Sequence, residues 1–307
     1  MSIRVLHDAR LQAAAGAVTI AMTGPLVAIS GVSSTTATVF RCAFALPMLG
    51  VMLMLRRRRV VVRDAPAARR RMAWHLLAGC FLGADMVLWT ESIHSVGAGV
   101  STVLVNIQVV VVPLIGLLAF GDRIPLRFGV VAPVLLAGVA LAGGVVDTGA
   151  AGSSPLYGTV TGVLAGVAYA AYLVLLRRSG SAGDRVMGLV GINVAAGVTG
   201  LVAGLTTGTF DPAPEPRALA WLVLLAVTGQ ILGWLLIGNG LARLTPSAGS
   251  TILLIQPVAA VVMGVVLLGE RPSAVQLVGC AVVLLAVGVV ARPGGVRAAQ
   301  RNRLAST

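Results

Sequence analysis

The chain has 307 residues, of which 57% are hydrophobic and only 11% are charged. Soluble domains carry about 25% charged residues, so the composition excludes an ordinary soluble protein and indicates a membrane protein. The net charge is +13 and all 23 basic residues are arginine. These arginines stand at the ends of apolar runs, a pattern that favours membrane topology over nucleic-acid binding.

Apolar runs long enough to cross a bilayer follow one another along the whole chain. A spanning helix needs about 20 apolar residues. Windows without charge, or with one or two charges, lie at 11–30, 35–55, 72–92, 92–121, 128–146, 148–176, 186–210, 218–242, 244–269 and 272–291. The runs are continuous and do not alternate, so they predict helices rather than barrel strands. We therefore expect an all-α membrane protein with ten transmembrane helices.

The distribution of arginine predicts how these helices are oriented. With the N-terminus in the cytoplasm, 20 arginines fall on the cytoplasmic side, whereas only Arg217 and Arg271 fall outside and Arg41 lies within the second helix. By the positive-inside rule, both termini, including a tail at 292–307, are expected to lie in the cytoplasm. The protein is then expected to be a multi-pass protein of the cytoplasmic membrane. The arginine-rich segment 56–71 could also bind anionic lipid, but a topology anchor is the simpler interpretation.

A short motif occurs twice, half a chain apart. LLGERPS (267–273) resembles AFGDRIP (119–125), and at the offset of 148 residues Gln108 aligns with Gln256. The repeat indicates two five-helix halves, 11–146 and 156–291. Because five is odd, the second half is predicted to be inverted in the membrane, as in many transporters. Locally, the motif predicts a tight turn in which glycine ends one helix and the acid stabilises the start of the next.

Three stretches carry a family resemblance. They are FRCAFALPML with Arg41, TVLVNIQVVVVPLIGLLAFGDR in the first half, and LLGERPSAVQLVGCAVVLLAVGVV near the end of the chain. Together with the duplicated halves, they resemble the EamA family of the drug/metabolite transporter (DMT) superfamily over about residues 11–292. The resemblance implies secondary transport, often export of amino acids, other metabolites or drugs, without naming the substrate. Many relatives have an acid before the proline of the ninth helix; here Gln256 precedes Pro257, which removes one candidate proton carrier.

Two acids and one arginine are predicted to lie at membrane depth, where ionisable groups are costly and are candidates for function. Asp85 and Arg41 lie at similar depths on the third and second helices. A structural ion pair between them and a role in substrate or proton handling both remain open. Glu91 is expected near the outer end of the third helix, where contact with interfacial water is the simpler interpretation.

Polar and aromatic side chains on other spans are candidates for lining a substrate cavity. They are Asn106, Gln108, Tyr169, Gln230, Trp234 and Gln256. Lipid offers no hydrogen bonds, so the amides should face the protein interior, where they could instead join helices together. Pro113 and Pro257 should each free a backbone carbonyl in mid-helix. A stripe of Gly158, Gly162 and Gly166 predicts close helix contact, which we expect inside the bundle.

These patterns favour a secondary transporter that works by alternating access, with export as the expected direction. Uptake or exchange by the same fold is the alternative, and a membrane enzyme or scaffold is less favoured because no catalytic cluster occurs. No cofactor, metal site or nucleic-acid partner is expected, although proton coupling is left open. The expected partners are a small-molecule substrate and the lipid bilayer; a homodimer is left open, but a monomer is sufficient.

Overall fold

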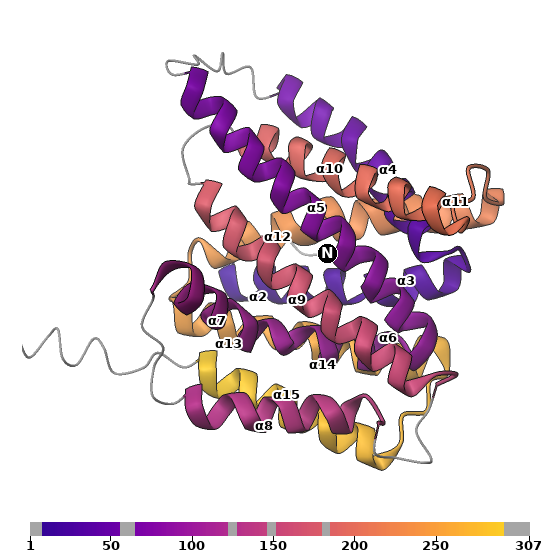
Figure 1. Cartoon of the computed structure of the whole chain (residues 1–307), viewed down its shortest axis with the longest axis vertical. Coiled ribbons are helices and arrows are strands. Elements are labelled where there is room, and N and C mark those ends of the chain that lie inside the picture. Colours follow the sequence, from indigo (N-terminus) through magenta and orange to yellow (C-terminus); the bar gives the residue numbers. More distant parts are fainter. Residues whose placement is uncertain (1–7, 56–64, 122–127, 146–151, 180–184, 292–307) are drawn as a thin grey trace, which may run out of the picture.

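The computed structural model describes residues 8–55, 65–121, 128–145, 152–179 and 185–291. Within these residues every regular element is a helix, and no strand occurs (Figure 1). The elements of the first half are α2 (Ala9–Ala21), α3 (Thr23–Ser30), α4 (Ser34–Leu55), α5 (Ala65–Val96), α6 (Ala98–Leu104), η1 (Val105–Ile107), α7 (Gln108–Phe120) and α8 (Phe128–Ala142). Those of the second half are α9 (Pro155–Ser179), α10 (Arg185–Thr207), α11 (Pro216–Leu225), η2 (Ala226–Leu232), α12 (Gly233–Leu241), α13 (Pro246–Leu253), α14 (Ile255–Leu268) and α15 (Ala274–Ala291).

The helices are long and apolar enough to make a multi-pass membrane protein. In the described part of the chain, seven helical segments can each cross a membrane. Shorter apolar helices lie at Phe128–Ala142, Ile255–Leu268 and Ala274–Val290. The expectation of an all-α membrane protein is therefore confirmed. The predicted tail at 292–307 and most of the arginine-rich segment lie outside the described residues.

Several of the helical rods are interrupted, and proline explains two of the breaks. Proline has no N–H to donate to the carbonyl four residues earlier. α2 ends at Ala21, four residues before Pro25, and α13 ends at Leu253, four residues before Pro257. The rod from α6 to α7 changes to a 3₁₀ turn, η1, just before Gln108. Proline does not account for that break, because Pro113 lies inside the regular helix α7.

Helix η2 is a π-helix that joins α11 to α12 and contains Gln230. A π-helical turn is rare and is found mainly at functional sites, because it costs regular hydrogen bonding and turns side chains out of the usual register. Its glycine, Gly229, lies close to Thr23, where α2 gives way to α3. Two irregular stretches of helix therefore meet inside the bundle.

Glycines let the central helices approach one another closely. A Cβ atom at Gly158, Gly162 or Gly166 of α9 would collide with α5, α6 or η1. The predicted use of this stripe inside the bundle is thus confirmed. Gly79 and Gly83 of α5 perform the same task against α10: a Cβ at Gly79 would lie 2.5 Å from the carbonyl oxygen of Ile192.

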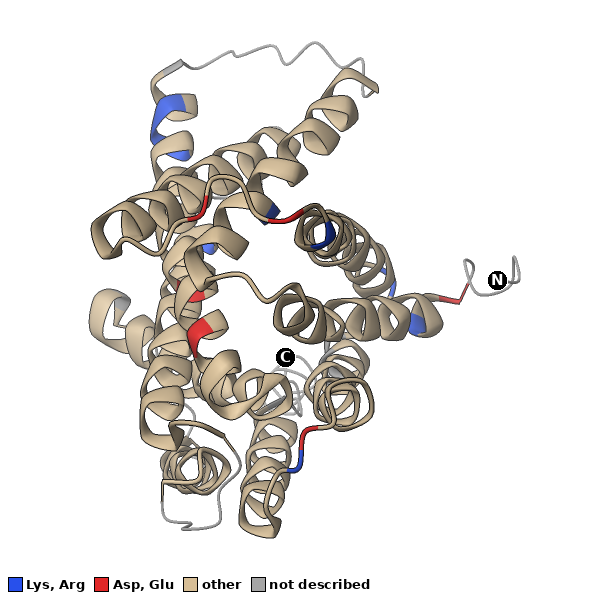
Figure 2. Cartoon of the chain, turned by 90° about the vertical axis from the view of Figure 1, so that its right-hand side faces the viewer, with Lys and Arg blue, Asp and Glu red and all other residues tan. Residues whose placement is uncertain are grey.

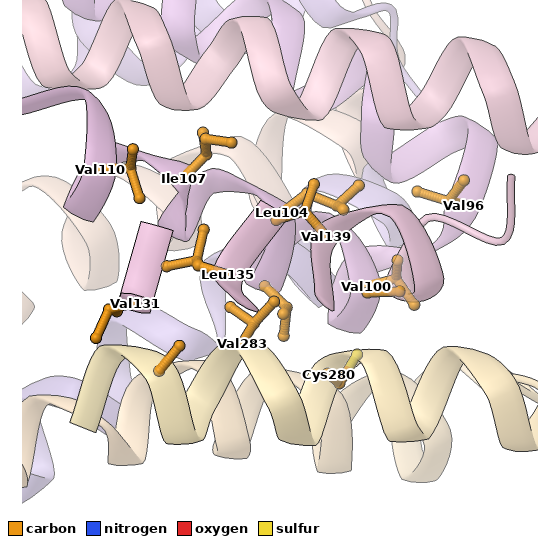
Figure 3. Close-up of a cluster of buried hydrophobic side chains, with 13 residues drawn as sticks. Val96, Val100, Leu104, Ile107, Val110, Val131, Leu135, Val139, Cys280 and Val283 are labelled. Atoms are coloured by element: carbon orange, nitrogen blue, oxygen red, sulfur yellow. The ribbon is translucent and has the colours of Figure 1, made fainter. Parts of the chain in front are cut away.

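The largest apolar cluster joins the two halves. Leu135 and Val139 of α8 pack against Val283 and Cys280 of α15, and Leu104 of α6 completes the contact (Figure 3). α8 and α15 lie side by side along one edge of the molecule (Figure 1). This core contains no charged residue, so it can stabilise the association of the halves but offers no chemistry.

The two ends of the bundle differ in charge. α5 runs from Arg69, Arg70 and Arg71 to Glu91, and α9 runs from Tyr157, which donates a hydrogen bond to Glu91, to Arg177 and Arg178. We call the end with Glu91 and Glu270 the carboxylate end and the opposite end the arginine end. Figure 2, which faces the carboxylate end, shows acidic residues on its turns with some basic residues beside them.

The repeated motif is built differently from the prediction in its second copy. Gly269 does end α14, with a left-handed φ of 67°. The expectation that Glu270 stabilises the start of the next helix is wrong, because Ser273 and Gln276 cap α15 reciprocally through each other's backbone N–H. Glu270 instead binds the backbone of α6 in the other half. Asp122, in the first copy, lies outside the described residues.

Candidate functional site

A buried cation and a buried anion lie near each other inside the bundle. Arg41 on α4 is 7% exposed and Asp85 on α5 is 9% exposed. Their charges are close enough to interact, but no ion pair within 4.0 Å joins them or links either to another described residue. No described residue donates a hydrogen bond to the Asp85 carboxylate. The two charges are therefore largely buried without being neutralised by direct contact.

The guanidinium of Arg41 is poorly satisfied by the protein. One terminal N–H donates to Oε1 of Gln230 over 3.4 Å, at the long limit of a hydrogen bond. Nε of Arg41 is buried and has no partner. A guanidinium carries five N–H donors in a planar fork that suits a carboxylate or a phosphate. Most of the donors of this fork therefore have no acceptor among the described residues.

Gln230 connects Arg41 to α10. Its amide nitrogen donates to Oδ1 of Asn193 over 2.9 Å, and the amide nitrogen of Asn193 donates to the carbonyl of Leu189. These contacts fix the orientation of Gln230, so that its oxygen faces Arg41. The π-helical turn of η2 carries Gln230 into this chain of hydrogen bonds. Sequence reasoning missed Asn193, although an amide in the middle of a charge-free span was the available signal.

Aromatic side chains of α9 border the same charges. The rings of Tyr169 and Tyr172 are in contact at a tilt of 36°, with centroids 5.5 Å apart, and both lie within range of the Asp85 charge. Tyr172 is buried, while Tyr169 is half-buried. Together with Arg41, Asp85, Asn193 and Gln230 they form what we call the central polar cluster, which draws on α4, α5, α9, α10 and η2.

The other predicted cavity residues occupy different places. Gln108 is the first residue of α7, directly after the 3₁₀ turn, and its Oε1 is buried without a partner. Asn106, in η1, donates to carbonyls at the end of the preceding helix α6, at Thr102 and Val103. Gln256 lies half-buried on α14, and Trp234 is 43% exposed on α12. No hydrogen bond joins these four residues to the central polar cluster within the described chain.

The unpartnered atoms single out two of the predicted site residues. Across the described residues, the buried side-chain polar atoms without any partner are Arg41 Nε and Gln108 Oε1. Leaving such atoms unpaired costs about 1–3 kcal/mol each. Because few buried groups in a folded protein are left unpaired, each calls for a ligand or a function.

Glu91 lies apart from this cluster, at the carboxylate end. Its carboxylate accepts hydrogen bonds from Ser34 at the start of α4 and, over 3.4 Å, from Tyr157 at the start of α9. It is half-buried. Glu91 thus ties together the ends of three helices, which gives it a structural task at this end. Within the described residues no group of His, Cys, Asp and Glu is arranged to hold a metal ion.

Comparisons with known proteins place this geometry in a family. One solved structure, described as "Crystal structure of protein", matches 92% of this chain and 95% of its own, with a TM-score of 0.55 and 17% identity. At that identity the match concerns the fold alone. The search of curated proteins finds no match. The model of the EamA-like transporter family matches residues 9–144 and again 156–292, so both halves of the chain are family repeats. The predicted resemblance is confirmed, and the chain belongs to the EamA-like transporter family.

Proposed function

We propose that this protein is a secondary active transporter that exports a small anionic or zwitterionic solute by alternating access. Its family consists of transporters of small molecules. The observation that carries the substrate class is the guanidinium of Arg41, buried in the bundle with most of its donors unused. A carboxylate or phosphate of the solute would occupy those donors through two parallel hydrogen bonds. Export is the direction that the family resemblance implies.

The second charge of the central polar cluster suits a zwitterion. Asp85 accepts no hydrogen bond from the described residues, so a solute ammonium group could pair with it while the solute's carboxylate pairs with Arg41. The tyrosine pair of α9 would contact the apolar part of such a solute. We also propose that Asp85 couples transport to protons when no solute is bound. It lies in mid-helix near a cation, and it could bind or release a proton without breaking a hydrogen bond to the described residues.

The architecture we propose for this transport is ten helices in two inverted halves. The helix breaks support it: η1 comes just before Gln108, and the break after α13 lies just before Gln256, its counterpart in the repeat. Interrupted helices where inverted repeats meet are the usual setting of a transporter site. We propose that the arginine end faces the cytoplasm of a cell's cytoplasmic membrane, which is the orientation supported by the excess of arginine.

Binding to purified protein tests the site without knowledge of the direction of transport. Detergent-solubilised protein would be heated with a panel of amino acids, carboxylates, phosphate esters and hydrophobic cations. Ligands with a carboxylate or phosphate should raise the melting temperature of the wild type, and Arg41→Gln should abolish this rise. Arg177→Gln, at the exposed end of α9, is the matched control and should behave as the wild type.

Transport of the best ligand would then be measured in proteoliposomes. Counterflow should be lost in Arg41→Gln and retained in Arg177→Gln, and an imposed pH gradient should drive it in the wild type but not in Asp85→Asn. Stabilisation by hydrophobic cations alone would contradict the proposed substrate class. Net transport only into right-side-out vesicles would favour the alternative of uptake, and exchange without net transport would favour an exchanger.

A further inference from the structure

The carboxylate of Glu270 reaches from the second half of the chain into the first. It lies between α14 and α15, and its two oxygens accept hydrogen bonds from the backbone N–H groups of Ala98, over 2.6 Å, and Gly99, over 3.2 Å. Ala98 and Gly99 are the first two residues of the helical rod that runs from α6 through η1 to α7. They have no partner within their own helix, and the positive end of the helix dipole favours an anion there.

Three glycines make room for this carboxylate. Gly97 has a φ of 90°, and a Cβ there would lie 2.8 Å from the carboxyl carbon of Glu270. A Cβ at Gly99 would lie 2.8 Å from the Cα of Val261, so this glycine lets α6 approach α14. A Cβ at Gly264 would overlap Oε2 of Glu270 itself. The receptacle is therefore built from both halves and accepts the side chain only while α6 and α14 are in contact.

The contact lies where α6 of the first half meets α14 of the second half. A cavity of about 200 Å³ beside it is lined by Val96, Gly97, Val100, Gly152, Glu270, Arg271 and Pro272. Val100, which lines the same cavity as Glu270, is only 2% exposed. A movement that parts α6 from α14 would therefore break both hydrogen bonds.

We propose that Glu270 is a latch that closes the transport path at the carboxylate end, and that each transport cycle releases it from α6 and re-forms it. The latch rests on the alternating access proposed above, and it makes Glu270 a positioning residue rather than a ligand of the solute. The structure is then the form closed at that end. The latch also gives the repeated motif a role that a simple turn lacks.

Accessibility of a cysteine behind the latch tests the proposal without any substrate. Val100→Cys would be introduced into a variant whose three native cysteines are replaced by serine. Intact cells that carry this variant would be treated with a membrane-impermeant maleimide, and the rate of labelling would be measured. Labelling should be slow while Glu270 is present. Glu270→Ala should raise its rate on the order of tenfold, since a charge-assisted contact to two N–H groups is lost. Glu270→Gln, which keeps one acceptor oxygen, should give a smaller rise.

A second variant displaces the carboxylate while keeping it in the protein. The added methyl of Gly264→Ala occupies the position of Oε2, so labelling of Val100→Cys should rise as in Glu270→Ala. Gly50→Ala is the matched control because nothing lies within 4 Å of a Cβ at that position of α4. Arg217→Gln, on the exposed first turn of α11, controls for a change of charge away from this cavity. Both controls should label as slowly as the parent protein.

The outcomes separate the latch from the transport proposal. Unchanged labelling in both Glu270→Ala and Gly264→Ala would overturn the latch. A rise seen only in inverted vesicles would support the latch but would contradict the proposed orientation, because it would place this end in the cytoplasm. Failure of every Glu270 and Gly264 variant to reach the membrane would make Glu270 a fixed structural cap and would also overturn it. Faster labelling in protein that carries no solute in counterflow would support the latch and reject the proposed transport.

Discussion

Removing the two buried charges of the central polar cluster together should be less harmful to folding than removing either one. Arg41→Met keeps an unbranched apolar stem, although a shorter one, and leaves Asp85 buried beside no cation. Asp85→Asn leaves the guanidinium of Arg41 without its nearby anion. The double variant removes both charges, and with them the cost of keeping Arg41 Nε unpaired in the interior.

The expected size of these effects follows from the geometry. Breaking a buried ion pair in direct contact costs about 3–5 kcal/mol. Here no ion pair forms within 4.0 Å, so the attraction lies below the roughly 4 kcal/mol that two charges gain at 4 Å with an effective dielectric constant of about 20. We expect each single variant to lose about 1–3 kcal/mol of unfolding free energy, and the double variant to match the wild type within about 1 kcal/mol.

The measurement is a double-mutant cycle on the unfolding free energy, from titration of dodecyl-maltoside micelles with sodium dodecyl sulfate. Transport in proteoliposomes would be measured on the same preparations and should be lost in all three variants. This combination, stability retained and transport lost, is what a cluster held ready for a solute predicts. A double variant at least as unstable as the worse single variant would refute the reasoning and make the cluster a structural element of the fold.

The remaining predictions concern packing, the midplane amides and topology. Gly79→Ala should destabilise the protein by about 1–3 kcal/mol, because the new Cβ meets the backbone oxygen of Ile192 and the helices must part. Gly50→Ala should stabilise the protein by up to about 1 kcal/mol. Thermal unfolding of the two variants tests both expectations. Gln108→Leu and Gln256→Leu should reach the membrane at normal levels but reduce transport; undiminished transport in both would leave these residues as helix contacts only. Reporter fusions at the N-terminus and the C-terminus should both be active in the cytoplasm, and an active periplasmic reporter at either end would contradict the proposed orientation.

Much of the fold follows from the sequence because a membrane makes local patterns decisive. Lipid cannot satisfy backbone groups, so each long apolar run must become a helix whatever its neighbours do. The break at Pro257 was likewise predictable, since proline leaves the carbonyl four residues earlier without its donor, and the same reasoning applies to Pro25. Close packing along the stripe of Gly158, Gly162 and Gly166 required only helical spacing.

Side-chain partners were decided by the tertiary structure, because they depend on how whole helices are placed against one another. The sequence predicts that Arg41 and Asp85 lie at similar depths in the membrane. Only the packing of α4 and α5 determines that no ion pair within 4.0 Å forms between them. The sequence offered Gln230 as a midplane amide, while the π-helical turn and α10 determine that it bonds to Asn193. Glu270 shows the limit most clearly: its local motif predicts a helix cap, but its hydrogen-bond partners lie 171 and 172 residues away. A short motif specifies the turn that it forms, whereas the contact between two halves arises only when they associate.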